Sequence, residues 1–152
     1  MIEDVAESDH FISYAQNGED VVLWRALCDV REGRYVDVGA ADPIEFSVTR
    51  AFCQRGWSGI DVEPVHEFAE ALRVDRPRNT VLECLIGDSE GDVTFYEFPE
   101  TGLSTADPAE AEHARDLGYS QVERTVPMRS LNAILKENFK SQEDFHFLKV
   151  DV

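Results

Sequence analysis

Carboxylates follow two short apolar segments of the chain at an interval that suits a nucleoside site. Asp37 precedes a run of small residues from Gly39 to Ala41, and Glu63 follows the apolar run that begins at Gly59. Small residues after a strand let a ligand approach the backbone, and an acid at the end of the next strand can accept hydrogen bonds from both ribose hydroxyls. This pattern indicates a binding site for a nucleoside cofactor.

The glycine pattern argues against a dinucleotide as that cofactor. The fingerprint G-x-G-x-x-G has a second glycine where the pyrophosphate touches the backbone, and Ala41 occupies that position here. A nicotinamide-binding oxidoreductase remains an alternative, because Glu63 suits the ribose of that cofactor too. A cofactor without a pyrophosphate fits the residues better.

Polar residues after two later apolar runs extend this candidate site. Gly87 and Asp88 follow the run at 80–86, so the Asp88 carboxylate could reach an adenine amino group. Asp151 ends the last apolar run and would face the same crevice, where it is the best-placed carboxylate for a polar role. We expect Lys149 and Asp151 to point to opposite faces of their strand and to form no salt bridge.

Parallel strands joined by helices are needed to bring these positions together. We expect strands at 35–38, 59–62, 80–86, 93–98, 122–128 and 145–152. We expect helices at 18–28, 47–55, 68–75, shortly after Pro108, and at 131–137, where Ser130 can cap the first turn. This alternation predicts an α/β fold with a mostly parallel sheet and right-handed crossovers.

The composition is that of one globular domain with an acidic surface. The chain has 152 residues, of which 43% are hydrophobic. Its 31 acidic and 14 basic residues give a net charge of −17, which would repel phosphate backbones and argues against nucleic-acid binding. No apolar run reaches the roughly 18 residues of a membrane span. The acidic start of the chain lacks the pattern of a signal peptide, so we expect a cytoplasmic location.

The cysteines and histidines predict no metal site. Cys28, Cys53 and Cys84 are irregularly spaced and include no C-x-x-C pair, and the four histidines are scattered. Zinc sites and disulfide frameworks need closer and more regular spacing. We therefore expect these thiols to be small apolar side chains in the interior.

Several stretches of the chain, taken together, match one known family. They are the motif Y-A-Q-N-G-E-D within 13–21, then 36–43 with 47–49, 56–64, 126–135 and 147–152. These stretches resemble the FkbM-type S-adenosylmethionine-dependent methyltransferases. The opening motif is more specific than the glycine turn, which any class I methyltransferase could share. The resemblance covers nearly all of the chain after residue 10.

The resemblance implies a three-layer, Rossmann-like class I methyltransferase sheet with S-adenosylmethionine at its carboxyl edge. It further implies O-methylation of a sugar or another small molecule that carries a hydroxyl group. It places Asp37, Gly39 and Ala40 under the methionine portion, Glu63 at the ribose, Asp88 near the adenine, and Gln16, Glu19 and Asp20 in a lid or wall over the methionine end. The other implied cofactor-binding residues are Asp42, Pro64 and Gly87.

We make separate predictions for the two ends of the chain. We expect residues 1–12 to be a flexible N-terminus and 13–152 to be the N-terminal portion of the methyltransferase domain. In the family the last strand continues as D-V-E-G into further elements, so we expect a sheet that is incomplete in its C-terminal half. An apolar terminal strand could also pair with a second copy. A truncated, non-catalytic domain that acts by association is therefore a further alternative.

Overall fold

The computed structural model describes residues 10–99, 101–140 and 145–151. Its helices are α1 (Glu19–Leu27), α2 (Arg50–Gln54), α3 (His66–Asp75), α4 (Pro108–Asp116) and α5 (Leu131–Asn138). Its strands are β1 (Arg34–Val38), β2 (Ser58–Val62), β3 (Thr80–Leu82), β4 (Leu85–Ile86), β5 (Gly91–Glu97), β6 (Val122–Arg129) and β7 (Phe147–Val150).

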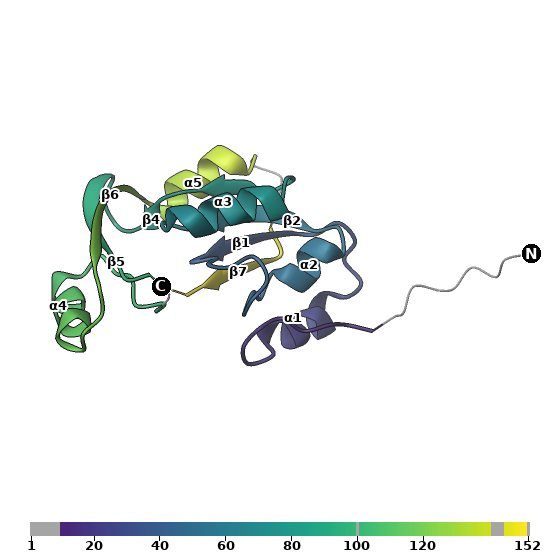
Figure 1. The fold of residues 1–152 in the computed structure, drawn as a ribbon. Helices are drawn as coiled ribbons and strands as arrows, with labels where there is room; N and C mark the ends of the chain where they lie inside the picture. The colour runs from purple at the N-terminus through teal and green to yellow at the C-terminus, as the bar shows by residue number, and fades with distance from the viewer. Residues whose placement is uncertain (1–9, 100, 141–144, 152) are drawn as a thin grey trace, which may run out of the picture.

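Four parallel strands form the main sheet, in the order β3-β2-β1-β7 (Figure 1). Val38 at the end of β1 pairs with Val62 of β2 on one side and with Val150 of β7 on the other. The carboxyl ends of these three strands therefore lie side by side at one edge. This arrangement confirms the prediction of a Rossmann-like α/β fold with a mostly parallel sheet.

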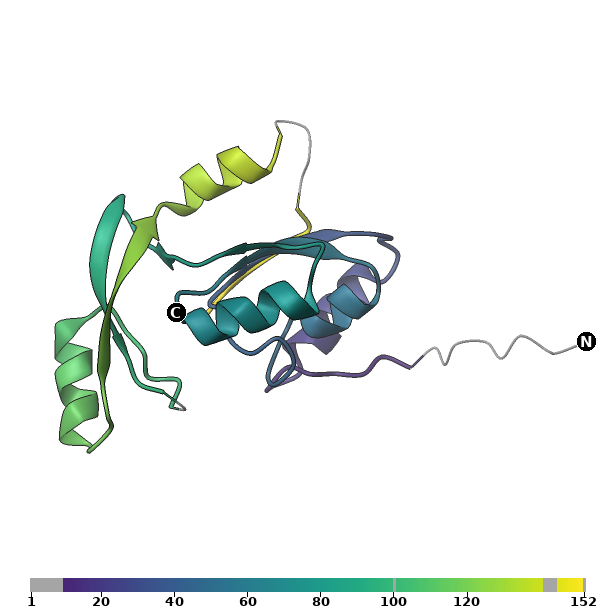
Figure 2. The same ribbon diagram turned by 45° about the horizontal axis from the view of Figure 1, so that its top comes forward.

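Helices cover both faces of the main sheet, as the three-layer prediction requires (Figure 2). Helix α5 packs Ile134 onto one face, against Val36 and Val62 among others. On the other face, Tyr35 of β1 packs with Phe52 of α2 and with side chains of α1. Strands buried on both faces are largely apolar. Apart from Asp37 and Asp61, the buried positions of β1 and β2 are apolar, which explains why both strands could be identified from the sequence.

A smaller second sheet, in the order β4-β6-β5, lies on the side toward which β7 runs (Figures 1 and 2). Its strands β5 and β6 are antiparallel, whereas β4 and β6 are parallel. The prediction of one strand at 80–86 is wrong, because the run divides into β3 of the main sheet and β4 of the second sheet. Cys84, between them, is 2% exposed and packs into the core between the main sheet and α5.

The helix starts show which local signals were reliable. Ser130 caps α5 as predicted, since its hydroxyl accepts a hydrogen bond from Ala133 N at 3.2 Å. Helix α2 is shorter than the predicted 47–55, because Ser47 and Thr49 lie in a turn where their hydroxyls bond to buried charged side chains.

No helix in the described part of the chain is both long and apolar enough to cross a membrane.

Candidate active site

The turn after β1 is fastened to the end of β2. Gly39 N and Ala40 N donate hydrogen bonds to Val62 O at 2.9 and 3.2 Å, and Ala41 N donates to Glu63 Oε2 at 2.8 Å. Gly39 has φ 72° and Ala41 has φ 51°, so the backbone is left-handed at both residues. Glycine adopts this conformation freely, whereas for alanine it costs about 1–2 kcal/mol. The hydrogen bond to Glu63 helps to hold Ala41 in it.

Glu63 is the carboxylate at the end of β2, as predicted. It is 4% exposed, and its Oε1 accepts a second hydrogen bond from Val65 N at 2.8 Å. Burial raises the pKa of Glu63, while the two backbone N–H groups oppose that shift. Each carboxylate oxygen has two lone pairs, so Glu63 can accept further hydrogen bonds from a ligand.

Charged side chains form a row across three strands. Asp61, Asp37 and Lys149 are paired positions on β2, β1 and β7, and paired residues point to the same face. Asp37 is 1% exposed, and its Oδ2 accepts a hydrogen bond from Thr49 Oγ1 at 2.6 Å. Its Oδ1 lies 3.1 Å from Lys149 Nζ, which also donates a hydrogen bond to Gly39 O. The row thus ends at the turn after β1.

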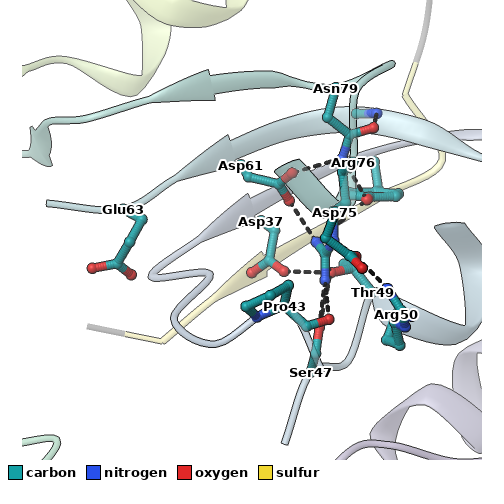
Figure 3. Close-up of polar contacts among 12 residues, drawn as sticks. Asp37, Pro43, Ser47, Thr49, Arg50, Asp61, Glu63, Asp75, Arg76 and Asn79 are labelled. Carbon is teal, nitrogen blue, oxygen red and sulfur yellow. Dashed lines mark hydrogen bonds and ion pairs between the residues drawn. The ribbon is translucent and has the colours of Figure 1, made fainter. Parts of the chain in front are cut away.

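Arg76, just after α3, is the centre of a buried network on this face (Figure 3). Its guanidinium pairs with Asp61 at 2.8 Å and donates hydrogen bonds to Thr49 Oγ1, Ser47 Oγ and Pro43 O, at 2.8, 2.7 and 3.0 Å. Burial raises the pKa of Asp61 to about 6, although Arg76 opposes this shift. The network ties the chain segment after the turn to the strands beneath it.

The opening motif lies along that same segment. Asp20 is fully buried, and its carboxylate accepts hydrogen bonds from Ser13 Oγ, Tyr14 N, Ala15 N and Val21 N at 2.7 to 3.2 Å. Ala15 forms a parallel bridge with Phe46 in the segment that follows β1. Asp20 therefore holds the motif in a fixed shape beside the candidate site.

The other predicted residues of the motif are on its surface. Gln16 and Glu19 are exposed, and Glu19 accepts hydrogen bonds from the backbone and side-chain nitrogens of Asn17. A hydrogen bond from its own backbone, with those from Asn17, lowers the pKa of Glu19. Of the predicted flexible N-terminus, 1–9 lie outside the described residues, whereas Phe11 stacks on Trp24.

Three predicted residues lie close to the turn along the same edge. Asp42 is half-buried and shapes the segment after the turn, because its Oδ1 accepts hydrogen bonds from Ile44 N and Glu45 N at 2.7 and 2.8 Å. Pro64 is half-buried and follows Glu63. Asp151 N donates to Val38 O at 3.0 Å, and its side chain is 84% exposed. The structure therefore brings Asp42, Pro64 and Asp151 to the edge that carries Glu63.

The structure does not place Gly87 and Asp88 at an end of the main sheet. They follow β4 of the second sheet, where Gly87 N donates to Arg129 O at 3.0 Å and Asp88 is exposed. A side chain at Gly87 would collide with Met128. The residue that follows β3 beside Glu63 is Glu83, because Glu63 N donates to Leu82 O, the last residue of β3. A contact of Gly87 or Asp88 with adenine remains a prediction.

Sequence reasoning missed Lys149, Thr49 and Arg76. The prediction that Lys149 and Asp151 point to opposite faces and form no salt bridge is wrong, because residues two apart in an extended segment share a face and the two charged groups lie within ion-pair distance. Lys149 Nζ lies 4.0 Å from Asp151 Oδ2 and reaches the carboxyl edge of the sheet. Alternation, read correctly, would have placed Lys149 with Asp151. Within the described ranges, no group of three or more His, Cys, Asp or Glu side chains could hold a metal ion.

Comparison with known proteins identifies the family. The family model described as "Methyltransferase FkbM domain" matches residues 37–152, from Asp37 in β1 onward. No curated protein and no solved structure matches the chain. The matched range is well over half of the chain, and it contains the turn after β1, Glu63 and Lys149. The chain belongs to the FkbM methyltransferase family.

Proposed function

We propose that this methyltransferase uses S-adenosylmethionine and binds it across the carboxyl ends of β2, β1 and β7. Supporting this is the position of Glu63, a buried carboxylate that borders a turn of small residues on the adjacent strand. The proposed cofactor residues are those predicted from the sequence, namely Gln16, Glu19, Asp20, Asp37, Gly39, Ala40, Asp42, Glu63, Pro64, Gly87 and Asp88.

Charge at this edge supports the choice of cofactor. S-adenosylmethionine supplies an electrophilic methyl group on a positively charged sulfur. Asp37, Glu63 and Asp151 gather at the edge around the ammonium of Lys149, which leaves an excess of negative charge there. That excess favours a cation over the pyrophosphate of a dinucleotide.

The chemistry left to the protein is alignment and removal of a proton. Methyl transfer is an in-line displacement, so the acceptor oxygen must be held opposite the bond that breaks. Asp151 is proposed as the base that takes the proton of an acceptor hydroxyl, because its exposed carboxylate stands beside the turn. The proposed acceptor is a sugar or another small molecule with a hydroxyl group.

Binding of S-adenosylhomocysteine is the test of this proposal. Titration calorimetry is expected to show saturable binding with one site per chain, because this product of methyl transfer keeps the adenosine and amino-acid parts of the cofactor. A parallel fluorescence titration with NADH is expected to show no binding. Binding of NADH without binding of S-adenosylhomocysteine would overturn the proposal, as would the absence of binding of either.

The affinity for S-adenosylhomocysteine is expected to fall as the pH is lowered through the raised pKa of Glu63. Burial raises the pKa of Glu63 above its usual 4.5. The ionised carboxyl is a charged acceptor at both oxygens, whereas protonation removes the charge and turns one oxygen into a donor, which weakens the hydrogen bonds from the ribose hydroxyls. Since the ligand binds the deprotonated form, affinity rises with pH through this pKa and is constant above it. Calorimetry across this range tests the expectation. The variant Glu63→Gln should show a flat profile, and an equally steep one would contradict the assignment.

A further inference from the structure

We propose that Lys149 recognises the carboxylate of the cofactor's amino-acid tail and so selects nucleosides that carry this tail. The inference rests on the proposed function. Lys149 lies on β7, and its side chain is 17% exposed, so a ligand at the edge can reach it. None of the cofactor residues predicted from the sequence is a partner for the tail carboxylate.

The order of the strands places Lys149 at a suitable distance from the ribose position. Strand β1, with its low-bulk turn, lies between β2 and β7. Strands in a sheet are about 4.8 Å apart, so β2 and β7 are separated by about 10 Å. A nucleoside whose ribose is held by Glu63 at β2 therefore extends its tail across the turn toward Lys149 at β7.

The hydrogen bonds of Lys149 leave it able to bind a ligand. An ammonium group has three N–H donors. One is directed to Gly39 O. Lys149 Nζ also lies 3.1 Å from Asp37 Oδ1, an ion pair without hydrogen-bond geometry, and Asp151 Oδ2 at 4.0 Å is too distant for a hydrogen bond. The remaining donors and the positive charge are available to the tail carboxylate.

Asp37, the ion-pair partner of Lys149, supplies a second observation. Its Oδ1 is buried, and none of the described groups donates a hydrogen bond of good geometry to it, although Lys149 Nζ is near. A buried carboxylate oxygen without such a donor is costly. The ammonium of an amino-acid tail is a donor that suits this oxygen. Lys149 and Asp37 together therefore match the opposite charges of a zwitterionic tail.

Two ligands that differ only in the tail test this inference. S-adenosylhomocysteine carries the amino acid, whereas 5′-methylthioadenosine has a methyl group in its place. The variant Lys149→Met is expected to bind S-adenosylhomocysteine about 10- to 100-fold more weakly, with the affinity for 5′-methylthioadenosine unchanged. Lys149→Gln, which keeps a donor for Gly39 O but has no charge, should behave in the same way. The matched control Lys136→Met, on α5, should bind both ligands normally.

Any other pattern of binding by the folded Lys149 variants overturns the inference. Equal losses for both ligands would mean that Lys149 only supports the turn. A gain in affinity for S-adenosylhomocysteine would mean that the Lys149 ammonium occupies the place of the tail ammonium. If Lys149→Met does not fold, as judged by circular dichroism, the comparison is made with Lys149→Gln. If the unaltered protein binds neither ligand, the proposed function itself fails, which is distinct from the failure of Lys149 alone.

Discussion

Replacing Arg76 by methionine is expected to lower the free energy of unfolding by about 3–5 kcal/mol. The substitution leaves the carboxylate of Asp61 buried without its cation, and it removes the donors that bond to Thr49, Ser47 and Pro43. Breaking a buried ion pair from one side is costly because the remaining charge cannot be solvated. Urea denaturation followed by circular dichroism measures this loss.

Two further variants separate this network from a general effect of losing an arginine. Arg73→Met removes an exposed arginine of α3 that pairs with Glu70, and it should change the stability by no more than about 0.5 kcal/mol. The double variant Asp61→Asn with Arg76→Met should lose less stability than the sum of the losses in the two single variants. We expect the difference, which is the coupling energy, to be about 0.5–3 kcal/mol. A loss in Arg76→Met as small as that in Arg73→Met would contradict the expectation.

The loss in Arg76→Met should also depend on pH. The pKa of Asp61 is already raised to about 6 by burial, and removal of the guanidinium raises it further. A carboxyl group whose pKa is higher in the folded protein stabilises the fold at low pH and loses that contribution as the pH rises. The variant should therefore be closest to the unaltered protein at acid pH and should lose stability faster on the way to neutral pH.

Replacing Glu63 by glutamine is expected to weaken the binding of S-adenosylhomocysteine by about 10- to 100-fold. The glutamine amide has only one oxygen, whereas Glu63 accepts hydrogen bonds from both Ala41 N and Val65 N with its two oxygens. The variant would lose the charge that attracts the ribose hydroxyls and one of the bonds that fix the turn. Titration calorimetry at neutral pH measures the change.

The variant Glu83→Gln is the matched control for Glu63→Gln. Glu83 follows β3 at the same edge of the main sheet, but its carboxylate pairs with His66 and Arg73 at the surface. We expect this variant to bind S-adenosylhomocysteine as the unaltered protein does. Equal losses of affinity in the two variants would show that the ligand is bound through the general negative charge of the edge and not through Glu63 itself.

The parts of the fold that the sequence predicted are those governed by local pattern. Strands β1 and β2 are buried on both faces, so their apolar runs were unambiguous, and Glu63 could be placed because it directly follows one of them. Ser130 was identified as a cap because hydroxyl residues before an apolar helical pattern commonly take that role. The shared edge of Asp37 and Glu63 followed from the parallel order of the strands.

The parts that escaped prediction depend on contacts between residues far apart in the sequence. Arg76 lies 15 residues from Asp61 and 27 from Thr49, and nothing in its neighbours distinguishes it from the exposed Arg73. The sequence predicts one strand at 80–86 because an apolar run rich in β-branched residues fits a strand of either sheet. The run forms two strands because β3 pairs with β2 in the main sheet and β4 pairs with β6 in the second sheet.

The second sheet has an apolar cluster of its own. Phe98 packs there against Ala111 and Ala114 of α4, with Tyr96 beside them, and none of these side chains belongs to the clusters on the main sheet. Changes in length or composition within 89–121 can therefore accumulate over evolution without rebuilding the layers around β1. The second sheet can therefore change its own packing while the neighbouring strands of the main sheet keep their geometry.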